Sequence, residues 1–382
     1  MSTRLRDDTP RCWAVIAGGG TAGHVSPGLA IARALVDAGH PVASIHYIGS
    51  ERGIETRLVP AAGFSLTVLP GRGIQRRMTR DNVGAVWGLM RAFARAYRLL
   101  GHLRPRVVVA LGGYASVPAA FAAFLRRVPV VVAEQNAVPG FANRAVSRFA
   151  RVCAVSFPGT ELPRAVVTGN PVREDVRVLD RAASRPGARS AMGIGDERML
   201  VAAFGGSLGA RMINDAVLGL AEVWLDRGDI ALWHVIGERD WDRCADRVAA
   251  FVAANDRGRL HYEAVRYEND MASLYAAADL VVCRSGASSV AEVALVGMPT
   301  VLVPLPGAPA DHQTANARAL VDAGGAVLVI DAELTAARLA SVLDPLVRDP
   351  ALVIRMGLAA ATLGRPDAAR AVAELVETYA RV

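Results

Sequence analysis

The chain has 382 residues, of which 52% are hydrophobic and 21% charged, a composition that predicts roughly two to three folded domains and excludes general disorder. Its 43 basic residues, all arginine, exceed the 36 acidic ones and give a net charge of +7, which suits an anionic partner without specifying one. The four cysteines have no metal-ligand spacing, and no apolar run approaches the length that spans a bilayer. The polar N-terminus lacks the apolar core of a signal peptide, so we expect a cytoplasmic protein.

Two segments predict a buried strand that leads into a glycine-rich turn and then a helix. In the first, residues 12–17 precede the turn GGGTAG and a helix expected over residues 27–38. In the second, residues 199–204 precede the turn GGSLGA and a helix that begins near Met212. Further strand-like runs alternate with helical stretches, at residues 106–111, 128–133, 232–237, 280–283 and 300–304.

This alternation predicts an α/β fold with parallel sheets covered by helices on both faces. We expect two doubly wound, Rossmann-like domains over residues 1–170 and 171–364, with a C-terminal helix at about 365–382 that packs back on the first. The arginine-rich stretch 181–189 is interpreted as an exposed polar loop. Because parallel sheets bind ligands at the carboxyl ends of their strands, the expected active site is a central cleft that both domains face.

The first glycine turn combines close backbone approach with a helix N-terminus, which attracts anions. It has neither the lysine of a phosphate-binding Walker loop nor the spacing of a dinucleotide fingerprint. His24 follows the turn directly, and it can be either a general base or a hydrogen-bonding group of the helix N-terminus.

Polar side chains also follow the later strands. Tyr114 and Ser116 come after one strand, and Glu134, Gln135 and Asn136 come after the next; they either bind a ligand or serve as turn and cap residues. In the second half, small residues at 285–289 open a helix that suits a diphosphate, and Glu292 can accept hydrogen bonds from ribose or complement the helix dipole. A proline-rich loop then delivers side chains that can bind sugar hydroxyls, namely Asp311, His312, Gln313 and Asn316.

Seven motifs, in the same order along the chain, resemble those of the MurG family, the peptidoglycan transferases that move GlcNAc from UDP-GlcNAc to lipid I and so form lipid II. They are GGGTAGHVSPGLA, GGYASVPAA, EQNAVPGFANR, TGNPVR, GGSLGARMIN, RSGASSVAE and PLPGAPADHQTANA. The resemblance implies a GT-B fold, with the acceptor on the first domain and the donor mainly on the second. It also implies inverting transfer without a metal or other cofactor.

The resemblance assigns substrate contacts to individual positions. Thr21, Ala22 and Gly23 match the loop that meets the diphosphates, Tyr114 lies in the GGY motif, and Glu268 matches a uracil-binding backbone position. Other matched positions are Asn136 for the donor sugar, Arg173 and Ser207 for the diphosphate side of the donor, Gln313 for the GlcNAc hydroxyls, and Ala287, Ser288, Ser289, Val290, Ala291 and Glu292 for uridine and ribose. Ala133 departs from the family because a histidine is usual there, on what we expect to be the acceptor side.

The chemistry requires a base for the acceptor hydroxyl and positive groups for the departing UDP. His24 and Glu134 are the candidate bases, and the sequence does not choose between them. Two alternatives stay open: a relative that glycosylates another lipid or a natural product, and a nucleotide-sugar binder without activity. The partners implied are UDP-GlcNAc, an undecaprenyl-diphosphate-linked acceptor and an anionic membrane surface, with no nucleic acid.

The membrane expectation depends on residues 72–98. Four arginines, Arg72, Arg76, Arg77 and Arg80, surround Ile74 and Met78 in the loop before a helix expected from about Asn82. In the helix an apolar stripe recurs at helical spacing, through Val83, Val86, Trp87, Met90, Phe93, Ala94 and Tyr97, with Arg91, Arg95 and Arg98 on another face. The stripe can pack on the sheet of an ordinary surface helix, or it can dock peripherally on the cytoplasmic face of the membrane.

Overall fold

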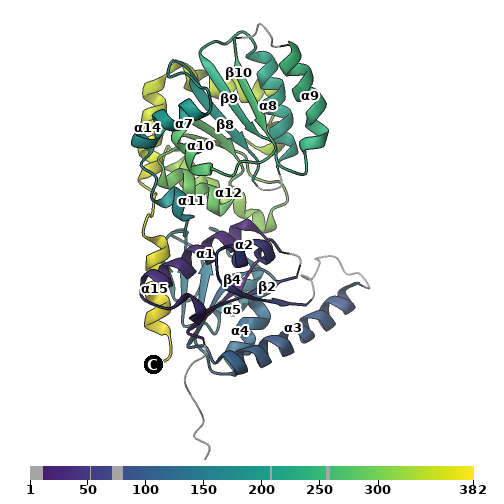
Figure 1. Ribbon diagram of the computed structural model, residues 1–382, viewed down its shortest axis with the longest axis vertical. Helices are drawn as coiled ribbons and strands as arrows, with labels where there is room; N and C mark the ends of the chain where they lie inside the picture. Colours follow the sequence, from purple (N-terminus) through teal and green to yellow (C-terminus); the bar gives the residue numbers. More distant parts are fainter. Residues whose placement is uncertain (1–11, 52, 71–80, 207–208, 255–258) are drawn as a thin grey trace, which may run out of the picture. The chain divides into compact units, whose positions relative to one another are not determined.

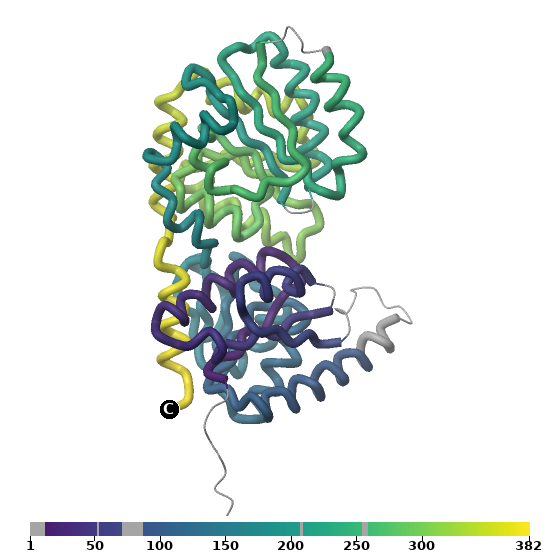
Figure 2. The backbone as a smooth tube through the Cα atoms, viewed as in Figure 1, coloured from purple at the N-terminus to yellow at the C-terminus, as the bar shows by residue number. Residues whose placement is uncertain are grey.

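The structure is a computed structural model that describes residues 12–51, 53–70, 81–206, 209–254 and 259–382. The chain forms two compact units (Figure 2). The first contains Met1–Pro171 together with Asp367–Val382, and the second contains Val172–Pro366. The C-terminal helix therefore belongs to the same unit as the start of the chain.

The first unit is built on a seven-stranded sheet in the order β3-β2-β1-β4-β5-β6-β7, in which every neighbouring pair is parallel. Its strands are β1 Ala14–Gly18, β2 Ile45–Ser50, β3 Ser65–Leu69, β4 Val107–Gly112, β5 Val130–Glu134, β6 Val152–Val155 and β7 Ala165–Val167. Its helices are α1 Ala22–Asp37, α2 Glu55–Ala61, α3 Asp81–Leu103, α4 Ser116–Leu125, α5 Phe141–Ser147 and α15 Ala368–Tyr379.

Helices cover both faces of this sheet (Figure 1). Alternate strand residues point to opposite faces, and they divide into two apolar clusters. One cluster joins Val108 and Val132 to residues of α3, α4 and α5. The other joins Val109 and Val131 to residues of α1, α2 and α15. The C-terminal helix thus completes one layer of the first unit.

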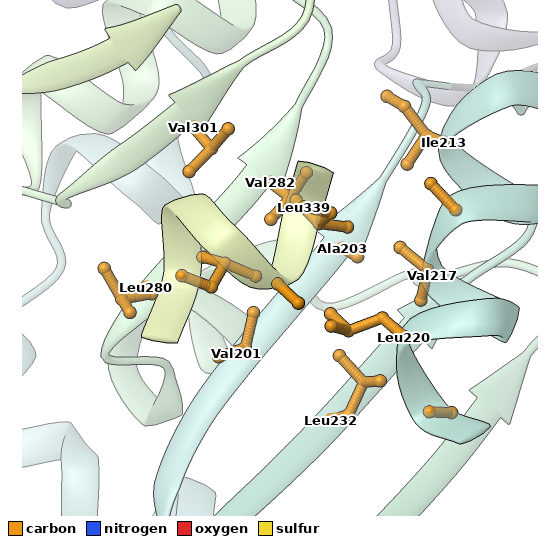
Figure 3. Close-up of a cluster of buried hydrophobic side chains, with 14 of the residues drawn as sticks. Val201, Ala203, Ile213, Val217, Leu220, Leu232, Leu280, Val282, Val301 and Leu339 are labelled. Atoms are coloured by element: carbon orange, nitrogen blue, oxygen red, sulfur yellow. The ribbon is translucent and has the colours of Figure 1, made fainter. Parts of the chain in front are cut away.

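The second unit has a six-stranded sheet in the order β10-β9-β8-β11-β12-β13, again parallel throughout. Its strands are β8 Met199–Phe204, β9 Ile230–Val235, β10 His261–Val265, β11 Leu280–Cys283, β12 Thr300–Leu302 and β13 Ala326–Leu328. Its helices are α6 Glu174–Arg177, α7 Arg181–Ala191, α8 Arg211–Val223, α9 Trp241–Ala254, α10 Met271–Ala277, α11 Ala287–Leu295, α12 His312–Asp322, α13 Ala336–Arg348 and α14 Pro350–Ala361. Figure 3 shows strand side chains such as Val201 and Val282 in one core with Val217 of α8 and Leu339 of α13.

The stretch 181–189 is helical, so the expectation of an exposed loop is wrong. Asp180 caps α7 by accepting a hydrogen bond from the Ala183 N–H. Arg185 and Arg189 reach Asp279 and the Ala277 carbonyl at the end of α10. These arginines satisfy carbonyl groups that the last turn of α10 leaves without helical partners, so tertiary contacts hold a segment whose glycine and proline disfavour a helix.

The predicted apolar stripe of α3 is only partly packed. Trp87, Met90 and Tyr97 are exposed, by 61%, 53% and 37%, whereas Phe93 packs against the core beside the sheet. The packed face of the helix is centred on Ala92, Ala96 and Leu100. The loop 71–80 lies outside the described residues. No helix in the described part of the chain is long and apolar enough to cross a membrane.

Candidate functional site

The first glycine turn is shaped by a residue that sequence reasoning missed, Glu55. Its carboxylate is fully buried and accepts hydrogen bonds from the N–H groups of Gly20 and Ser50, at 2.8 and 2.7 Å, and from the Ser50 hydroxyl. A Cβ atom at Gly19 or Gly53 would collide with this carboxylate. Glu55 therefore holds the backbone of the turn in place through these hydrogen bonds. In the sequence, only the small residues of the turn hint that another group approaches it closely.

The turn leads directly into α1, with Thr21 as N-cap and with Ala22 and Gly23 in the first turn of the helix. The helix begins five residues before the expected start and includes Pro27. Its N-terminus follows the carboxyl end of β1, where the helix dipole favours an anionic ligand; the His24 N–H already donates to the Thr21 carbonyl.

His24 lies half-buried beside the end of β4 and the Asn143 side chain of α5. Its Nδ1 atom is 3.3 Å from the Thr21 hydroxyl. A Cβ atom at Gly112 would lie 3.2 Å from His24 Nε2 and 3.3 Å from Asn143 Nδ2, so the imidazole and the amide border the same glycine. Gly112 has a φ of +97°, a conformation that favours glycine. The fold therefore brings His24 to a crowded, polar edge of the sheet.

Glu134 is buried and fully hydrogen-bonded at the end of β5. One oxygen accepts from the Asn136 N–H and side-chain amide, at 2.9 and 3.2 Å, and the other accepts from the Gly140 N–H and the Asn143 amide, at 3.1 and 2.9 Å. Four donors leave this carboxylate little capacity to accept a substrate proton. Glu134 instead holds the loop that contains Asn136 in place.

Two other expected positions of the first unit point away from this edge. The Tyr114 hydroxyl donates to the Pro70 carbonyl at 2.9 Å, and the buried Ser116 hydroxyl donates to the Gly113 carbonyl. Ala133 is 3% exposed and packs in the cluster that contains α1 and α15. The Ala133 side chain therefore lies in the apolar core, and the expectation that position 133 belongs to the acceptor side stays a prediction.

In the second unit, α11 places Glu292 beside two polar partners. The Tyr275 hydroxyl donates to Glu292 Oε2 at 3.0 Å, and Arg173 adds a favourable charge interaction. Burial raises the pKa of Glu292 to about 7, while Arg173 and the Tyr275 hydrogen bond oppose that rise. Arg173 itself is bound to Asp175 by two hydrogen-bonding nitrogens, at 2.8 and 2.6 Å. Tyr275 is a residue of this site that the sequence did not single out.

The N-terminus of α11 and the residue before its N-cap contain two buried hydroxyl groups. Gly286 is its N-cap, and Ala287, Ser288, Ser289, Val290 and Ala291 form its first turns before Glu292. The hydroxyl oxygens of Ser285 and Ser288 are buried, and among the described residues they have no hydrogen-bond partner. Such groups are costly to leave unpaired, and a polar ligand at this helix N-terminus would satisfy them.

The remaining expected donor contacts lie on loops of the second unit. Gln313 is in the first turn of α12, and its side-chain oxygen accepts from the Leu305 N–H at 2.9 Å. This bond ties α12 to the proline-rich loop and leaves the amide nitrogen as the group that can reach a ligand. Glu268 lies between β10 and α10, where its carboxylate accepts from the Asp270 N–H. Ser207 lies outside the described residues.

A buried polar network supports the second glycine turn. His234, fully buried on β9, contacts the Asn214 side-chain oxygen through Nε2 at 3.0 Å and the Tyr262 hydroxyl through Nδ1 at 3.1 Å. Asn214 in turn donates to the Ile236 carbonyl, on which Gly209 packs so closely that a Cβ atom would lie 2.3 Å from it. No sequence pattern indicates this network, because its members are separated by 20 or more residues.

The described residues contain no group of three or more acidic, histidine or cysteine side chains that could hold a metal ion. The polar groups that the fold gathers are instead helix N-termini, a buried carboxylate, hydroxyls and an arginine. This set suits a nucleotide diphosphate and its sugar. Each of the two parallel-sheet units has a glycine turn at the carboxyl edge of its strands, which is where such sheets bind nucleotide ligands.

Comparison with known proteins identifies the class of protein. The N-terminal domain of glycosyltransferase family 28 matches residues 14–155, and its C-terminal domain matches residues 200–372. The transferase named UDP-N-acetylglucosamine--N-acetylmuramyl-(pentapeptide) pyrophosphoryl-undecaprenol N-acetylglucosamine transferase in Nocardioides sp. is 43% identical over 362 residues, which cover 95% of this chain and 96% of the relative. Its namesake in Mycolicibacterium vanbaalenii is 42% identical, over 96% of this chain and 90% of the relative.

A crystal structure of MurG from Acinetobacter baumannii superposes with a TM-score of 0.75 at 29% identity, over 96% of this chain and 99% of that one. UDP-GlcNAc 2-epimerase from Neisseria meningitidis shares the fold alone, with a TM-score of 0.63 at 14% identity. The chain is therefore a glycosyltransferase with two Rossmann-like domains. Within that class it belongs to the MurG family of N-acetylglucosamine transferases.

Proposed function

We propose that the protein transfers GlcNAc from UDP-GlcNAc to the lipid-linked muramyl-pentapeptide, which converts lipid I to lipid II in peptidoglycan synthesis. Membership of the MurG family supports this reaction. The observation that carries the donor half is the buried Glu292 in the second turn of α11, together with the hydroxyls of Ser285, before the helix, and Ser288, in its first turn, which have no hydrogen-bond partner among the described residues. In the proposed complex the carboxylate accepts hydrogen bonds from the ribose hydroxyls, and the serine hydroxyls form hydrogen bonds with the diphosphate or with uridine.

In the proposed reaction the acceptor hydroxyl attacks the anomeric carbon as UDP leaves from the opposite face, so the configuration inverts. His24 takes the hydroxyl proton, because it borders Gly112 at the sheet edge while the Glu134 carboxylate is occupied by four donors. The negative charge that develops on UDP is met by the N-terminus of α11 and by Arg173. Glu134 contributes by fixing Asn136 and the loop around it.

We propose that this charge stabilisation requires no metal ion or other cofactor. The arginine and helix N-termini described above supply the positive groups that a divalent ion supplies elsewhere. Full activity in excess EDTA is the expected result. Loss of activity that Mg²⁺ or Mn²⁺ restores would contradict the proposal.

The experiment that tests the reaction is UDP release from UDP-GlcNAc, with and without lipid I. Release that depends on lipid I, with formation of lipid II, is the expected result. Binding of UDP-GlcNAc without turnover would identify a sugar-nucleotide binder, and turnover only with a different acceptor would identify a relative of other specificity.

We further propose that the protein docks peripherally on the cytoplasmic face of the membrane through α3 and α4. Trp87 and Met90 are exposed on α3, and Phe121, Phe124 and Leu125 are exposed on the neighbouring α4 by 41%, 51% and 60%. Several large apolar side chains exposed on adjacent helices mark an interaction surface, and an acceptor held in a bilayer has to be reached at its surface.

The docking test is co-sedimentation with vesicles of phosphatidylglycerol and phosphatidylcholine. Trp87→Ser with Met90→Ser should weaken vesicle binding severalfold, because both side chains lose apolar surface that the bilayer would cover. The affinity for UDP in solution should not change. Equal vesicle binding by this variant and the wild type would contradict docking through α3.

A further inference from the structure

One arginine side chain connects the ends of three neighbouring strands of the second unit, β11, β12 and β13. Arg284 follows β11 directly and is 9% exposed. Its Nη1 atom donates to the carbonyl oxygens of Val303 and Pro304, at 3.3 and 3.1 Å, where the proline-rich loop leaves β12. The same atom forms an ion pair with the carboxylate of Asp331, which follows β13. The Asp331 side chain is 12% exposed, so the pair is largely shielded from water.

The strand ends that Arg284 connects carry two loops with polar groups of the donor site. One is the turn before α11, which contains the buried Ser285 hydroxyl. The other is the proline-rich loop, which leads into α12 and Gln313. Asn316, fully buried on α12, donates to the Ser285 carbonyl at 3.2 Å, and Gln313 accepts from the Leu305 N–H. Side chains therefore link the two loops at the carboxyl edge of the sheet.

The proline-rich loop has a strained backbone. Ala310 and Asp311 are consecutive residues with φ values of 53° and 50°, in the left-handed region where a side chain is unfavourable. Such a conformation persists only where surrounding contacts impose it. The hydrogen bonds from Arg284 hold the start of this loop, and the bond between Gln313 and the loop holds its end.

Asp331 supplies the negative charge that keeps the Arg284 guanidinium in place. An arginine that is nearly buried is unfavourable without a counter-charge, so it would turn towards water if the carboxylate were lost. The carbonyl groups of Val303 and Pro304 would then lose their donor. Asp331 itself follows the edge strand of the sheet, two strands from β11. It therefore acts on the donor site through Arg284.

We propose that Asp331 is a positioning residue that sets the proline-rich loop relative to the turn before α11 and so determines how well the sugar of the donor is recognised. The inference rests on the proposed function, in which the donor is UDP-GlcNAc. The nucleotide is bound by α11 and Glu292, whereas the sugar is bound by polar side chains of the loop and of α12, such as Gln313. Loss of Asp331 should therefore weaken recognition of the sugar and spare that of UDP.

The test is calorimetric titration of the full chain with UDP-GlcNAc, with its C4 epimer UDP-GalNAc and with UDP. The variant is Asp331→Asn, which keeps the size of the side chain and removes its charge. The matched control is Asp279→Asn. The Asp279 carboxylate also pairs with arginines of the second unit, but it precedes β11 and so lies at the opposite edge of the sheet from the donor loops.

In Asp331→Asn the affinity for UDP-GlcNAc should fall about tenfold, because a hydrogen bond to a charged group is lost, and the preference over UDP-GalNAc should narrow. The affinity for UDP should change little. Both variants lose an ion pair and should unfold at a lower temperature, so stability alone cannot produce a difference between them. An unchanged ratio of UDP-GlcNAc to UDP affinity in Asp331→Asn, or the same change of this ratio in Asp279→Asn, would overturn the proposal.

A second variant decides the question if Asp331→Asn does not fold. Asp331→Glu keeps the charge but displaces the carboxylate by one methylene, so the preference for UDP-GlcNAc over UDP-GalNAc should narrow to an intermediate value. A wild-type preference in this variant would overturn the positioning role.

The same titrations separate this inference from the proposed function. Wild-type protein that binds UDP-GlcNAc but forms no lipid II would contradict the proposed transfer, and the comparison of the variants would still decide the role of Asp331. Wild-type protein that does not bind UDP-GlcNAc would contradict the proposed donor and the inference with it.

Discussion

Glu292 gives the most direct test of the donor site, because its carboxyl group changes charge near neutral pH. Burial raises the pKa of this carboxyl group to about 7. In the proposed complex the ionised carboxylate accepts hydrogen bonds from ribose, so the donor binds the deprotonated protein and the KM for UDP-GlcNAc should rise on acidification. At pH 6 only about a tenth of the molecules are ionised, which predicts a KM roughly tenfold above its limit at high pH.

Two substitutions separate the charge from the packing. Glu292→Gln retains an acceptor for the Tyr275 hydroxyl but loses the charge, and hydrogen bonds to charged groups contribute about 1.5–3 kcal/mol. The KM for UDP-GlcNAc should therefore rise about tenfold or more, and its pH dependence should disappear. Tyr275→Phe removes a hydrogen bond that lowers the pKa of Glu292, so the inflection should move to higher pH.

The assay is the initial rate of UDP release at varied UDP-GlcNAc and saturating acceptor, from pH 5.5 to about 9, in a buffer series of constant ionic strength. The thermal unfolding temperature of each variant checks that the fold is intact. A Glu292→Gln protein with the KM and pH profile of the wild type would refute the assignment of this carboxylate to the ribose. An unmoved inflection in Tyr275→Phe would refute the origin given for the pKa.

Three further predictions address the base, the buried histidine and α7. His24→Gln should lower kcat about a hundredfold or more with little change in KM. Glu134→Gln should instead lower the unfolding temperature by several degrees, because an amide cannot accept hydrogen bonds from all four loop donors. The reverse pattern in steady-state kinetics and calorimetry would make Glu134 the base. Burial lowers the pKa of His234 to about 3, so the unfolded state takes up a proton below about pH 6.5 and the folded state does not. Stability present above pH 6.5 is then lost on acidification, by about 2 kcal/mol between pH 7 and pH 5, and chemical denaturation of His234→Gln should lack this difference. Arg189→Met should destabilise the second unit by about 3 kcal/mol or more, and an unchanged denaturation midpoint would contradict the role given to α7.

The sequence predicted the buried strands best where an apolar run ends at a glycine or a polar residue. The bounds of β8 and β11, Met199–Phe204 and Leu280–Cys283, agree with the runs expected from the sequence. Both strands are central in their sheet, with helices over the faces, so continuous apolar character is required of them. The glycine turns after β1 and β8 were likewise visible, because few other residues allow so close a backbone approach.

Contacts between distant segments decided the rest of the local structure. The sequence of α7 has poor helix propensity, and its helix is held by arginine contacts to Ala277 and Asp279, about 90 residues away. Glu55 meets Gly20 from 35 residues away, so no local pattern connects the two. A carboxylate in sequence says nothing of which backbone N–H groups will surround it.

The sequence by itself thus determined the family, the fold class and the strand-end loops, because these follow from side-chain periodicity and from motifs of adjacent residues. Only the tertiary structure decided which face each side chain takes and which groups are already hydrogen-bonded. Periodicity found the apolar stripe of α3, but the face that packs, with Ala92, Ala96 and Leu100, is rotated from it and leaves Trp87 exposed. His24 and Glu134 were the first and second candidates for the base, and the sequence could not decide between them. In the structure Glu134 is buried and accepts from four donors, whereas His24 borders a glycine at the sheet edge.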